Sequence, residues 1–378
     1  MGKKTIGIAV DSFLPRWDGI ARVLLEFIPR LTSDFNFKLL VPRYEGERPS
    51  FNGAEYVLFP LLPWLRIEGA GLPLVSGAKI QVAFEDIDLL WTHSVGTLGG
   101  KAMSEAKRRA IPIVSMIHST EWEIYAQNLP FLNDAFRGFW LRECRKRYQA
   151  ATRILTPSQA TADTLRHNGF NVPISVTPLG VDTQRFQPLE PAERAARKRA
   201  LGIDDALFVI GYLGRFGAEK NLELLAEAFD RLGDPSTHLL LVGGKSDALR
   251  RKPHSPNVTV VGSTTEPEHY YQAMDAYVLP SRSESAPLAI LEAMASGAIP
   301  LSTPVGNVPS YLHPSIGYLF AQDDATSLVS SLRRLLSQPE QHLIMRNGAR
   351  ELVMTEFDWN ESAEKIGTVF DELLPSNG

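Results

Sequence analysis

Residues 276–297 of this 378-residue chain read AYVLPSRSESAPLAILEAMASG, which predicts a strand, a short polar loop and a helix. The run Ala276–Pro280 has the apolar character of a buried strand, and Gly297 suits the left-handed position just after a helix. Pro287 fits the first helical turn, where a missing N–H costs little. A strand that enters a helix through a short loop is half of a βαβ unit. We therefore expect this loop at the carboxyl edge of a parallel sheet, where ligands bind.

Two glutamates flank the start of the predicted helix. Glu284 lies just before it, and Glu292 lies about two turns into it. The free N–H groups at a helix N-terminus carry about half a positive charge and favour a phosphate group. Both carboxylates accept hydrogen bonds from hydroxyl groups, so the stretch suits a ligand with a phosphate centre and hydroxyls at both ends. A nucleotide sugar has that form.

The composition indicates a two-domain protein of the cytoplasm. A length of 378 residues accommodates two domains, and 44% hydrophobic residues are sufficient for their cores. The formal charge of −4 gives no support for nucleic-acid binding. Cys144 is the one cysteine, so no internal disulfide can form, which fits a reducing compartment. No apolar run reaches the roughly 18 residues of a membrane span, and Thr5–Val10 is too short for a signal peptide.

Both halves of the chain alternate strands with helices. The predicted strands are 5–10, 37–41, 88–92, 111–117, 153–157, 174–177, 208–213, 238–242, 258–261, 277–279 and 299–302. The predicted helices are 20–31, 136–153, 158–168, 190–200, 222–232, 266–274, 327–337, 339–356 and 361–374. Such alternation is typical of parallel sheets, and the interdomain linker is expected near 180–190.

Gly19 lies at the start of the first predicted helix, which Asp18 or Gly19 itself would cap. Without a side chain, its backbone can approach a ligand closely, and the alternative is that it serves only a tight turn. No G-x-G-x-x-G motif occurs here, so the usual signature of a dinucleotide cofactor is missing.

Two histidines follow predicted strands of the first half. His93 and His118 both lie where a strand ends, at the expected ligand edge, and His118 is the stronger candidate for a functional role. The alternative for each is a structural hydrogen bond. Asp86 and Asp88 form the D-x-D pattern of metal-dependent sugar transferases, but the pattern is short and precedes a strand. We therefore predict no metal site.

The loop after strand 208–213 carries Arg215 and Lys220. A glycine-containing loop with two cations at the carboxyl end of a strand is suited to holding phosphate, because arginine offers a planar fork and lysine a compact charge. The alternative is that both are ordinary surface charges.

Two further segments indicate a membrane surface or an apolar acceptor. Residues 56–75 are apolar with three prolines and two glycines, which predicts a loop or broken helix. This segment either packs on its own domain or forms an exposed apolar rim. Residues 136–153 mix aromatic side chains with arginines and a lysine and predict a basic amphipathic helix. That helix is either a solvated surface helix or a contact for anionic lipid heads.

Several motifs together resemble the family-four retaining glycosyltransferases. They are Gly214-Arg215 with Glu219-Lys220-Asn221, Gly243, Gly262, Pro280–Glu284 with Glu292, Gly180-Val181-Asp182 with Phe186, and Phe357-Asp358-Trp359. Two glutamates with seven residues between them are that family's signature. The resemblance covers nearly the whole chain, and it is strongest between residues 174 and 310.

The resemblance implies an α/β protein with the GT-B fold, in which two Rossmann-like domains face each other across a deep cleft. The N-terminal acceptor domain would comprise residues 1–185 and a returning helix at 359–378, and the donor domain residues 186–358.

The resemblance also implies a donor site. The catalytic residues would be His118, Glu284, Arg215 and Lys220, and the other donor-binding residues Gly19, Gly243, Gly262, Leu288, Ala289 and Glu292. Arg215 and Lys220 would hold the diphosphate, with the backbone N–H groups near Leu288 and Ala289. Glu292 would bind the ribose hydroxyls, Glu284 the transferred sugar, and Gly262 would line the base pocket.

From the first domain, Gly19 would approach the donor and His118 would contact the sugar near the reacting centre. Two positions depart from the family pattern. Asp18-Gly19 replaces two adjacent glycines, and Asn307 and Ser310 occupy the region where the family commonly has a glutamate. These departures affect the details of donor contact and not the reaction class.

The expected reaction moves a sugar of the mannose or glucose type from a GDP- or UDP-sugar to a hydroxyl acceptor, a lipid or glycan at the membrane surface. Two cations and a helix terminus stabilise the leaving diphosphate, so no metal or other cofactor is expected. The acceptor would attack from the face that the leaving group departs, with retention. The enzyme would be cytoplasmic and peripheral to the inner face of the membrane. The alternatives are a soluble sugar or sugar-phosphate acceptor, a nucleotide-sugar epimerase, and a non-catalytic binding protein.

Overall fold

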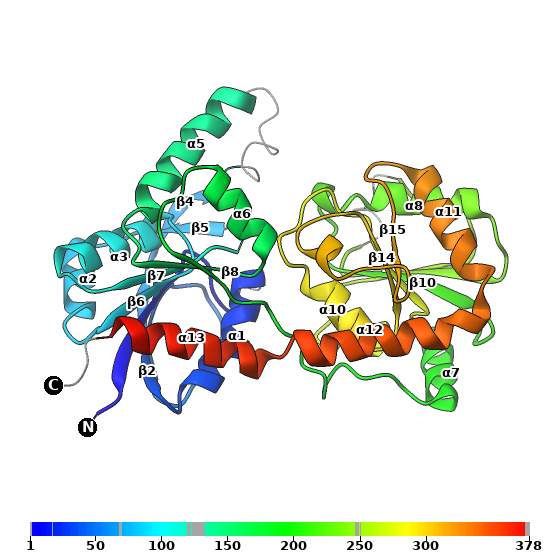
Figure 1. Cartoon of the computed structure of the whole chain (residues 1–378), viewed down its shortest axis with the longest axis horizontal. Coiled ribbons are helices and arrows are strands. Elements are labelled where there is room, and N and C mark those ends of the chain that lie inside the picture. Colours follow the sequence, from blue (N-terminus) through cyan, green and yellow to red (C-terminus); the bar gives the residue numbers. More distant parts are fainter. Residues whose placement is uncertain are drawn as a thin grey trace. The chain divides into compact units, whose positions relative to one another are not determined.

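A computed structural model describes residues 2–16, 18–67, 70–118, 122, 133–245, 249 and 251–374. The chain forms two compact units (Figure 1). The first comprises Met1–Pro178 and Trp359–Gly378, and the second comprises Leu179–Asp358. The sequence predicts the division after residue 185. In the structure it follows Pro178, because the N–H of Val181 donates to the carbonyl of Phe357 at 2.9 Å and Val181 is buried in the second core.

The first unit is built on a seven-stranded sheet in the order β3-β2-β1-β6-β7-β8-β9, and all the strand pairs within it are parallel. The strands are β1 (Lys4–Ala9), β2 (Phe35–Pro42), β3 (Ala54–Phe59), β6 (Leu89–Thr92), β7 (Ile113–Met116), β8 (Arg153–Thr156) and β9 (Ile174–Val176). The helices are α1 (Gly19–Leu31), α2 (Gly77–Ala83), α3 (Thr97–Arg108), α5 (Asn133–Tyr148), α6 (Gln159–His167) and α13 (Trp359–Leu373). This is a Rossmann-like order, and its direction reverses between β1 and β6.

Successive residues of a strand point to opposite faces of this sheet, and each face has its own helices. Leu90 lies on the face that packs against α2, α3 and α5. Its neighbour Trp91 points to the other face, where its ring lies 6.1 Å from Phe27 of α1 and 5.3 Å from Phe370 of α13. Trp359, the first residue of α13, meets Phe27 edge-on at 5.1 Å. Helix α13 therefore completes the core of the first unit, although more than 170 residues separate it from β9.

The second unit repeats the scheme with a six-stranded sheet in the order β12-β11-β10-β13-β14-β15, again with parallel pairs. The strands are β10 (Phe208–Leu213), β11 (Thr237–Val242), β12 (Val258–Val261), β13 (Ala276–Leu279), β14 (Ile299–Ser302) and β15 (Tyr318–Leu319). The helices are α7 (Pro191–Ala200), α8 (Leu222–Leu232), α9 (Glu268–Tyr271), α10 (Leu288–Ala295), α11 (Ala325–Leu336) and α12 (His342–Glu356). Helices α8 and α11 cover one face, and α10 and α12 the other. The strand order reverses between β10 and β13.

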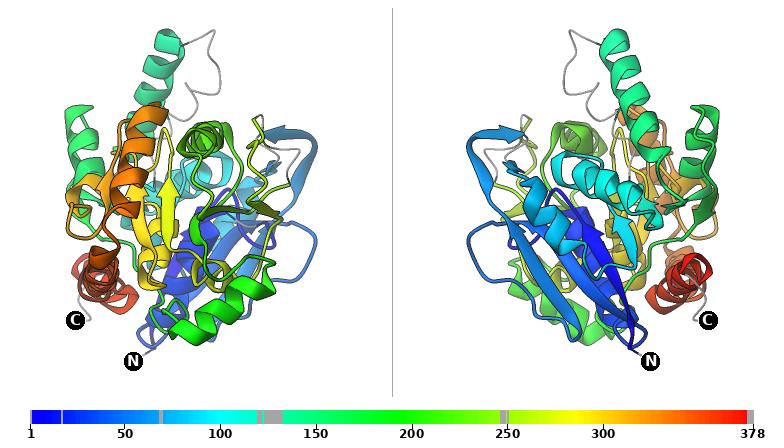
Figure 2. Two further views of the ribbon diagram at one scale, coloured as in Figure 1. Left: turned by 90° about the vertical axis from the view of Figure 1, so that its right-hand side faces the viewer. Right: turned by 90° about the vertical axis from the view of Figure 1, so that its left-hand side faces the viewer.

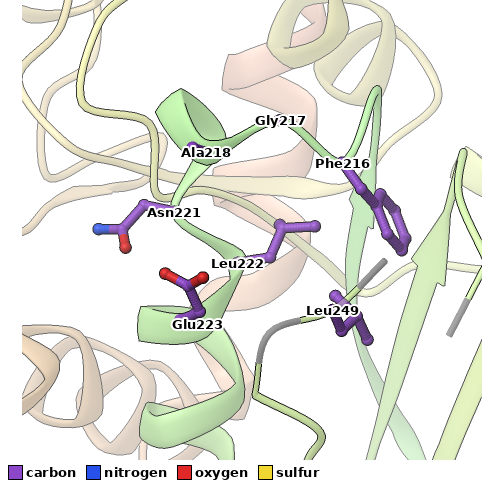
Figure 3. Close-up of a pocket in the computed structure, with 7 residues that line it drawn as sticks. All are labelled: Phe216, Gly217, Ala218, Asn221, Leu222, Glu223 and Leu249. Carbon is purple, nitrogen blue, oxygen red and sulfur yellow. The ribbon is translucent and has the colours of Figure 1, made fainter. Parts of the chain in front are cut away.

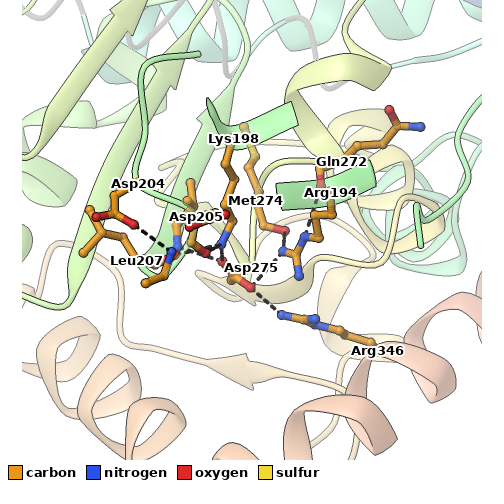
Figure 4. Close-up of polar contacts among 11 residues, drawn as sticks. Arg194, Lys198, Asp204, Asp205, Leu207, Gln272, Met274, Asp275 and Arg346 are labelled. Atoms are coloured by element: carbon orange, nitrogen blue, oxygen red, sulfur yellow. Dashed lines mark hydrogen bonds and ion pairs between the residues drawn. The ribbon is translucent and has the colours of Figure 1, made fainter. Parts of the chain in front are cut away.

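A buried carboxylate at the amino end of β13 joins several elements of the second unit (Figure 4). Asp275 lies 2.8 Å from Arg194 and 2.8 Å from Lys198, both of α7, and 2.6 Å from Arg346 of α12. It also accepts the N–H of Val209 in β10 at 2.9 Å. Burial alone would raise the pKa of Asp275, but the three cations hold it below its ordinary value. One side chain thus fixes two helices to the sheet.

The structure corrects the prediction for residues 56–75. These residues complete β3 and form an antiparallel pair, β4 (Leu61–Ile67) and β5 (Ala70–Pro73), instead of a loop or broken helix. The prolines are compatible with strands here because Pro60 lies between β3 and β4, and Pro63 lies where the register of the pair shifts.

Helix α5 extends from Asn133 to Tyr148, so it begins three residues before the predicted basic helix of residues 136–153 and ends five residues before the end of that prediction. Cys144 and Tyr148 are buried in the core, whereas Phe139 is 57% exposed. The first turns of α5 stand away from the sheet of the first unit (Figure 2). Among the described residues, no helix has the length and apolar character needed to cross a membrane.

Candidate functional site

Two loops meet at the reversal point of the second sheet. Residues 214–221 follow β10 and residues 280–287 follow β13, and these strands are neighbours. The N–H of Arg282 donates to the carbonyl of Glu219 at 2.8 Å, and the Arg282 guanidinium donates to the carbonyl of Ala218 at 3.2 Å. The two loops therefore form one connected surface at the carboxyl edge, where Rossmann-like sheets bind ligands.

A lysine and a glutamate join these loops. Nζ of Lys220 lies 2.6 Å from Oε1 of Glu284, and Ser281 Oγ donates to the same oxygen at 2.8 Å. The two charged side chains are only 20% and 14% exposed. The sequence analysis singles out both residues, which are more than sixty positions apart in the chain. The structure brings them into contact.

Helix α10 begins directly beside this pair. Pro287 precedes it in an extended conformation, and its first turn has no acidic residue. No side chain of the described residues caps its first N–H groups. Leu288 and Ala289 occupy that turn and are half-buried. Ser285, in the loop before the helix, lies close to Gly306. A Cβ at Gly306 would lie 2.3 Å from the carbonyl oxygen of Ser285. The backbone at Gly306 thus packs closely against the segment that leads into α10. The positive N-terminal end of this helix has no acidic residue in its first turn.

The reversal point of the first sheet is different, because aspartates satisfy its helix termini. Asp11 accepts the N–H groups of Leu98 at 2.7 Å and of Gly99 at 3.3 Å, both in the first turn of α3. Asp18 caps α1 by accepting the N–H of Ala21 at 2.8 Å. Of the two related sheets, only the second has at this position a helix start free of a capping carboxylate within the described residues. That contrast favours the second unit as the phosphate-binding one.

Behind the site lies a group of buried tyrosines that the sequence analysis does not single out. The hydroxyl of Tyr271 donates to Oε2 of Glu292 at 3.1 Å, and burial together with the Glu292 charge raises the Tyr271 pKa well above its ordinary value. Tyr277 donates to the carbonyl of Leu213 at 3.2 Å. A tyrosine within an apolar strand is a signal for such a contact, because its hydroxyl needs a partner when buried.

Gly243 allows the loops after β10 and β11 to approach each other. It has φ +117°, and a Cβ would lie 2.2 Å from the carbonyl of Gly214. Its N–H donates to Val261 at 3.0 Å and to Gly262 at 3.2 Å. At Gly262 nothing lies within 4 Å of a built Cβ, so sterics in the described structure do not require glycine there.

Arg215 lies apart from the Lys220–Glu284 pair. Its side chain is 76% exposed and forms an ion pair with Glu219 of the same loop. Gly19 and His118 lie in the first unit, at the start of α1 and just after β7, respectively. Among the residues that the structure describes, nothing lies within 4 Å of a Cβ built on Gly19. The structure therefore joins Lys220 and Glu284 directly and places Arg215 in a separate ion pair.

A small pocket of about 260 Å³ lies next to the first loop, between Phe216, the start of α8 and Leu249 (Figure 3). Neither Lys220 nor Glu284 lines it. The amide of Asn221, one of its lining residues, donates to Asp323 at 2.9 Å. The pocket is therefore adjacent to the Lys220–Glu284 site and separate from it.

The D-x-D pattern lies at the amino edge of the first sheet, opposite the carboxyl edge where ligands are expected. Asp88 pairs with Lys4 at 3.1 Å and accepts the N–H of Thr5 at 2.8 Å, and Asp86 pairs with Lys38. Both carboxylates thus have local cationic partners. In the described part of the chain, no three His, Cys, Asp or Glu side chains are grouped as they would be around a metal ion.

Comparisons with known proteins identify the family of this chain. The sequence model of the family described as "Glycosyl transferases group 1" matches residues 193–352, and that of "Glycosyltransferase Family 4" matches residues 17–185. The sulfoquinovosyl transferase SQD2 of Arabidopsis thaliana is 28% identical over 87% of this chain, which spans 65% of that protein's length. A GDP-mannose-dependent monoacylated alpha-(1-6)-phosphatidylinositol monomannoside mannosyltransferase of Corynebacterium glutamicum is 24% identical over 97% of each chain.

Solved structures share the fold. Sucrose-phosphate synthase from Thermosynechococcus elongatus superposes with a TM-score of 0.78 at 19% identity, covering 98% of this chain and 99% of the other. WaaG, a glycosyltransferase involved in lipopolysaccharide biosynthesis, superposes with a TM-score of 0.73 at 17% identity over 99% and 100%. The two Rossmann-like units thus have the GT-B fold. The chain belongs to the retaining glycosyltransferases of family four and is a hexosyltransferase.

Proposed function

We propose that this enzyme transfers a mannose- or glucose-type sugar from a GDP- or UDP-sugar to a hydroxyl of a lipid or glycan at a membrane surface. The observation that carries the proposal is the Lys220–Glu284 pair beside the uncapped start of α10. A cation and free N–H groups suit a diphosphate, and the adjacent carboxylate suits the hydroxyls of a hexose.

The donor would lie along this surface. Lys220 and the N–H groups of Leu288 and Ala289 bind the diphosphate, and the exposed Arg215 can turn from Glu219 toward it. Glu284 accepts hydrogen bonds from the sugar, and Glu292, held by Tyr271, accepts from the ribose. The turns at Gly243 and Gly262 line the base. The second unit is thus the donor domain, and the first, with Gly19 and His118, the acceptor domain.

The chemistry follows from where charge develops. As the bond between the sugar and the diphosphate lengthens, negative charge grows on the leaving phosphate and positive charge on the sugar ring. Lys220 and the positive end of α10 are already in place at the phosphate, so they stabilise the transition state without reorganising. The acceptor hydroxyl attacks from the face that the diphosphate leaves, so the α-configuration of the sugar is retained. The hydroxyl transfers its proton to the leaving phosphate.

The nature of the donor can be tested directly. We expect the purified protein to consume one or a few of the UDP-, GDP- and ADP-sugars of mannose, glucose and related hexoses, with release of the nucleoside diphosphate. Product analysis by mass spectrometry should show the sugar on an acceptor from a panel of lipid extracts and soluble sugars. Isomerised donor without any acceptor product would contradict the proposal and favour an epimerase.

A membrane-surface acceptor is supported by the named substrate of the Corynebacterium mannosyltransferase and by helix α5. Phe139 is 57% exposed on α5, and Arg142 and Lys146 are exposed one turn apart on the same helix. Exposed cations with an aromatic side chain bind anionic lipid heads. The proposed location is therefore the cytoplasmic face of a membrane.

Flotation with vesicles tests this location. The protein should float with vesicles that contain anionic lipid and remain behind with purely zwitterionic ones. Arg142→Glu combined with Lys146→Glu should weaken binding at least about tenfold, because each basic residue near such a surface contributes about 1 kcal/mol. Lys101→Glu with Lys107→Glu, which reverses two exposed charges on α3, is the matched control. No binding by the parent protein would favour a soluble acceptor.

A further inference from the structure

Two histidines of the first unit share a hydrogen bond. His93 follows β6 and His118 follows the adjacent parallel strand β7, so both lie at the carboxyl edge of the sheet. Nδ1 of His93 lies 2.8 Å from Nε2 of His118. The ring centroids are 5.0 Å apart, and the ring planes differ by 19°. Because the nitrogens are so much closer than the centroids, the rings lie edge to edge in nearly one plane, as an N–H···N bond requires.

His93 is held more firmly than His118. Its backbone N–H donates to the carbonyl of Ala9 at 3.2 Å, and its ring packs 4.5 Å from that of Trp91 between centroids. His93 is 2% exposed, whereas His118 is half-buried and keeps part of its surface accessible. His93 is therefore the fixed member of the pair, and His118 is the member that a ligand can reach.

Each ring has a second nitrogen outside this hydrogen bond, Nε2 in His93 and Nδ1 in His118. The surroundings of these outer nitrogens decide which ring donates the shared proton. Nε2 of His93 is buried and has no hydrogen-bond partner within the part of the chain that the structure describes. Burial lowers the pKa of His118 to about 4 and that of His93 well below its ordinary value, so both rings are neutral near pH 7 and one proton lies between them. If His118 supplied that proton, His93 would carry an unpaired buried N–H, which is rare in proteins. If His93 supplies it, the buried nitrogen is a bare lone pair.

We propose that His93 is a positioning residue: its Nδ1–H donates to Nε2 of His118 and thereby fixes Nδ1 of His118 as an N–H donor. This inference rests on the proposed function, in which His118 belongs to the acceptor domain, and on the expectation from the family resemblance that His118 contacts the transferred sugar. The partner of this donor is an oxygen atom, either of a hexose hydroxyl or of a phosphate. His118 then orients the substrate through a neutral hydrogen bond, and at neutral pH its outer nitrogen does not act as a base.

Nitrogen NMR of protein labelled with 15N-histidine tests the tautomer without any substrate. Protonated and bare imidazole nitrogens resonate in separate ranges, and His→Phe variants assign the signals. At pH 7, His118 should show a protonated Nδ1 and a bare Nε2, and His93 a protonated Nδ1 and a bare Nε2. A protonated Nε2 on His118 would overturn the proposal.

Kinetics test the positioning role. His93→Phe should lower kcat about tenfold, the equivalent of one hydrogen bond, with the KM for the nucleotide sugar unchanged. His93→Asn should recover most of the activity, because its amide N–H can replace Nδ1–H. His238→Phe removes a buried histidine of the second unit, whose Nε2 lies 2.9 Å from Thr259 Oγ1, and it controls for general loss of stability.

The possible failures are distinguishable. If the parent protein transfers no sugar, the proposed function fails, while the NMR result still decides the tautomer. If the parent is active and His93→Asn is as impaired as His93→Phe, or if His238→Phe is impaired equally, His93 has no positioning role. Should His93→Phe not fold, the spectrum of the parent protein and the activity of His93→Asn decide the question.

Discussion

Lys220→Ala is expected to lower kcat for sugar transfer by about 10²–10³-fold, the usual cost of removing one group that stabilises developing charge. The lysine is positioned by Glu284, 2.6 Å away, and it lies beside the positive end of α10. Its removal deletes a cation from the leaving phosphate. It also leaves the carboxylate of Glu284 unneutralised where a diphosphate must bind. Steady-state kinetics with the preferred donor, supported by circular dichroism of the variant, measure the effect.

The exposed Lys252 provides a control in the same unit, and Lys252→Ala should retain parental kcat. Glu284→Gln should be less impaired than Lys220→Ala, because an amide can still bond to a hexose hydroxyl. Unchanged turnover in Lys220→Ala would mean that the donor phosphate lies elsewhere, and the assignment of this site would be wrong.

Asp275→Asn is expected to reduce the free energy of unfolding by about 3–5 kcal/mol, the range found when one partner of a buried ion pair is removed. Arg194, Lys198 and Arg346 all point at this carboxylate, which is 9% exposed (Figure 4). Asparagine leaves three partly or fully buried cations without their shared counter-charge. The midpoint of urea unfolding, followed by circular dichroism, reports the change.

Acid should reveal the same interaction. The folded pKa of Asp275 is lowered, so its stabilising effect is present above the unfolded pKa and is lost as pH falls through the folded pKa. The difference in the free energy of unfolding between the parent protein and Asp275→Asn should therefore disappear in strong acid. Asp205→Asn is the control, because Asp205 is 40% exposed in its pair with Arg199 and exposed pairs contribute little. A difference between parent and Asp275→Asn no larger than that of this control would contradict the expectation.

Much of the second unit follows from local sequence. The strands β10, β12 and β14 and the helix α8 occupy the residues that the sequence predicts. Their apolar runs are bounded by glycine, proline or polar loops, and buried parallel strands give just such runs. Gly297, with φ +85°, lies just after α10 as its sequence position indicates. Here local signals and tertiary structure agree.

The first unit is less predictable because distant residues decide its elements. Helix α3 begins in a glycine-rich segment with weak helix propensity, and the side chain of Asp11, more than eighty residues earlier, caps it. No local pattern reveals such a cap. The prolines at 60 and 63 indicate a loop, yet a strand boundary and a register shift accommodate both.

The candidate site was partly accessible from spacing alone. The glutamate spacing and the helix start place Glu284 and Glu292 at one sheet edge. Spacing does not tell which charges pair, and in the structure Lys220 contacts Glu284 while Arg215 contacts Glu219. The histidine pair was also inaccessible, because it depends on two strand ends that become neighbours only in the folded sheet.

Helix α13 has a consequence for synthesis on the ribosome. The rings of Phe27 and Trp91 are covered by Trp359 and Phe370, which are translated after the whole second unit. A nascent chain that ends at Pro178 therefore exposes an aromatic surface of its sheet and cannot complete its core. The second unit contains all of its own strands and helices and can finish folding earlier. The unit that is translated first thus completes its core last, and its exposed apolar surface favours aggregation during that interval.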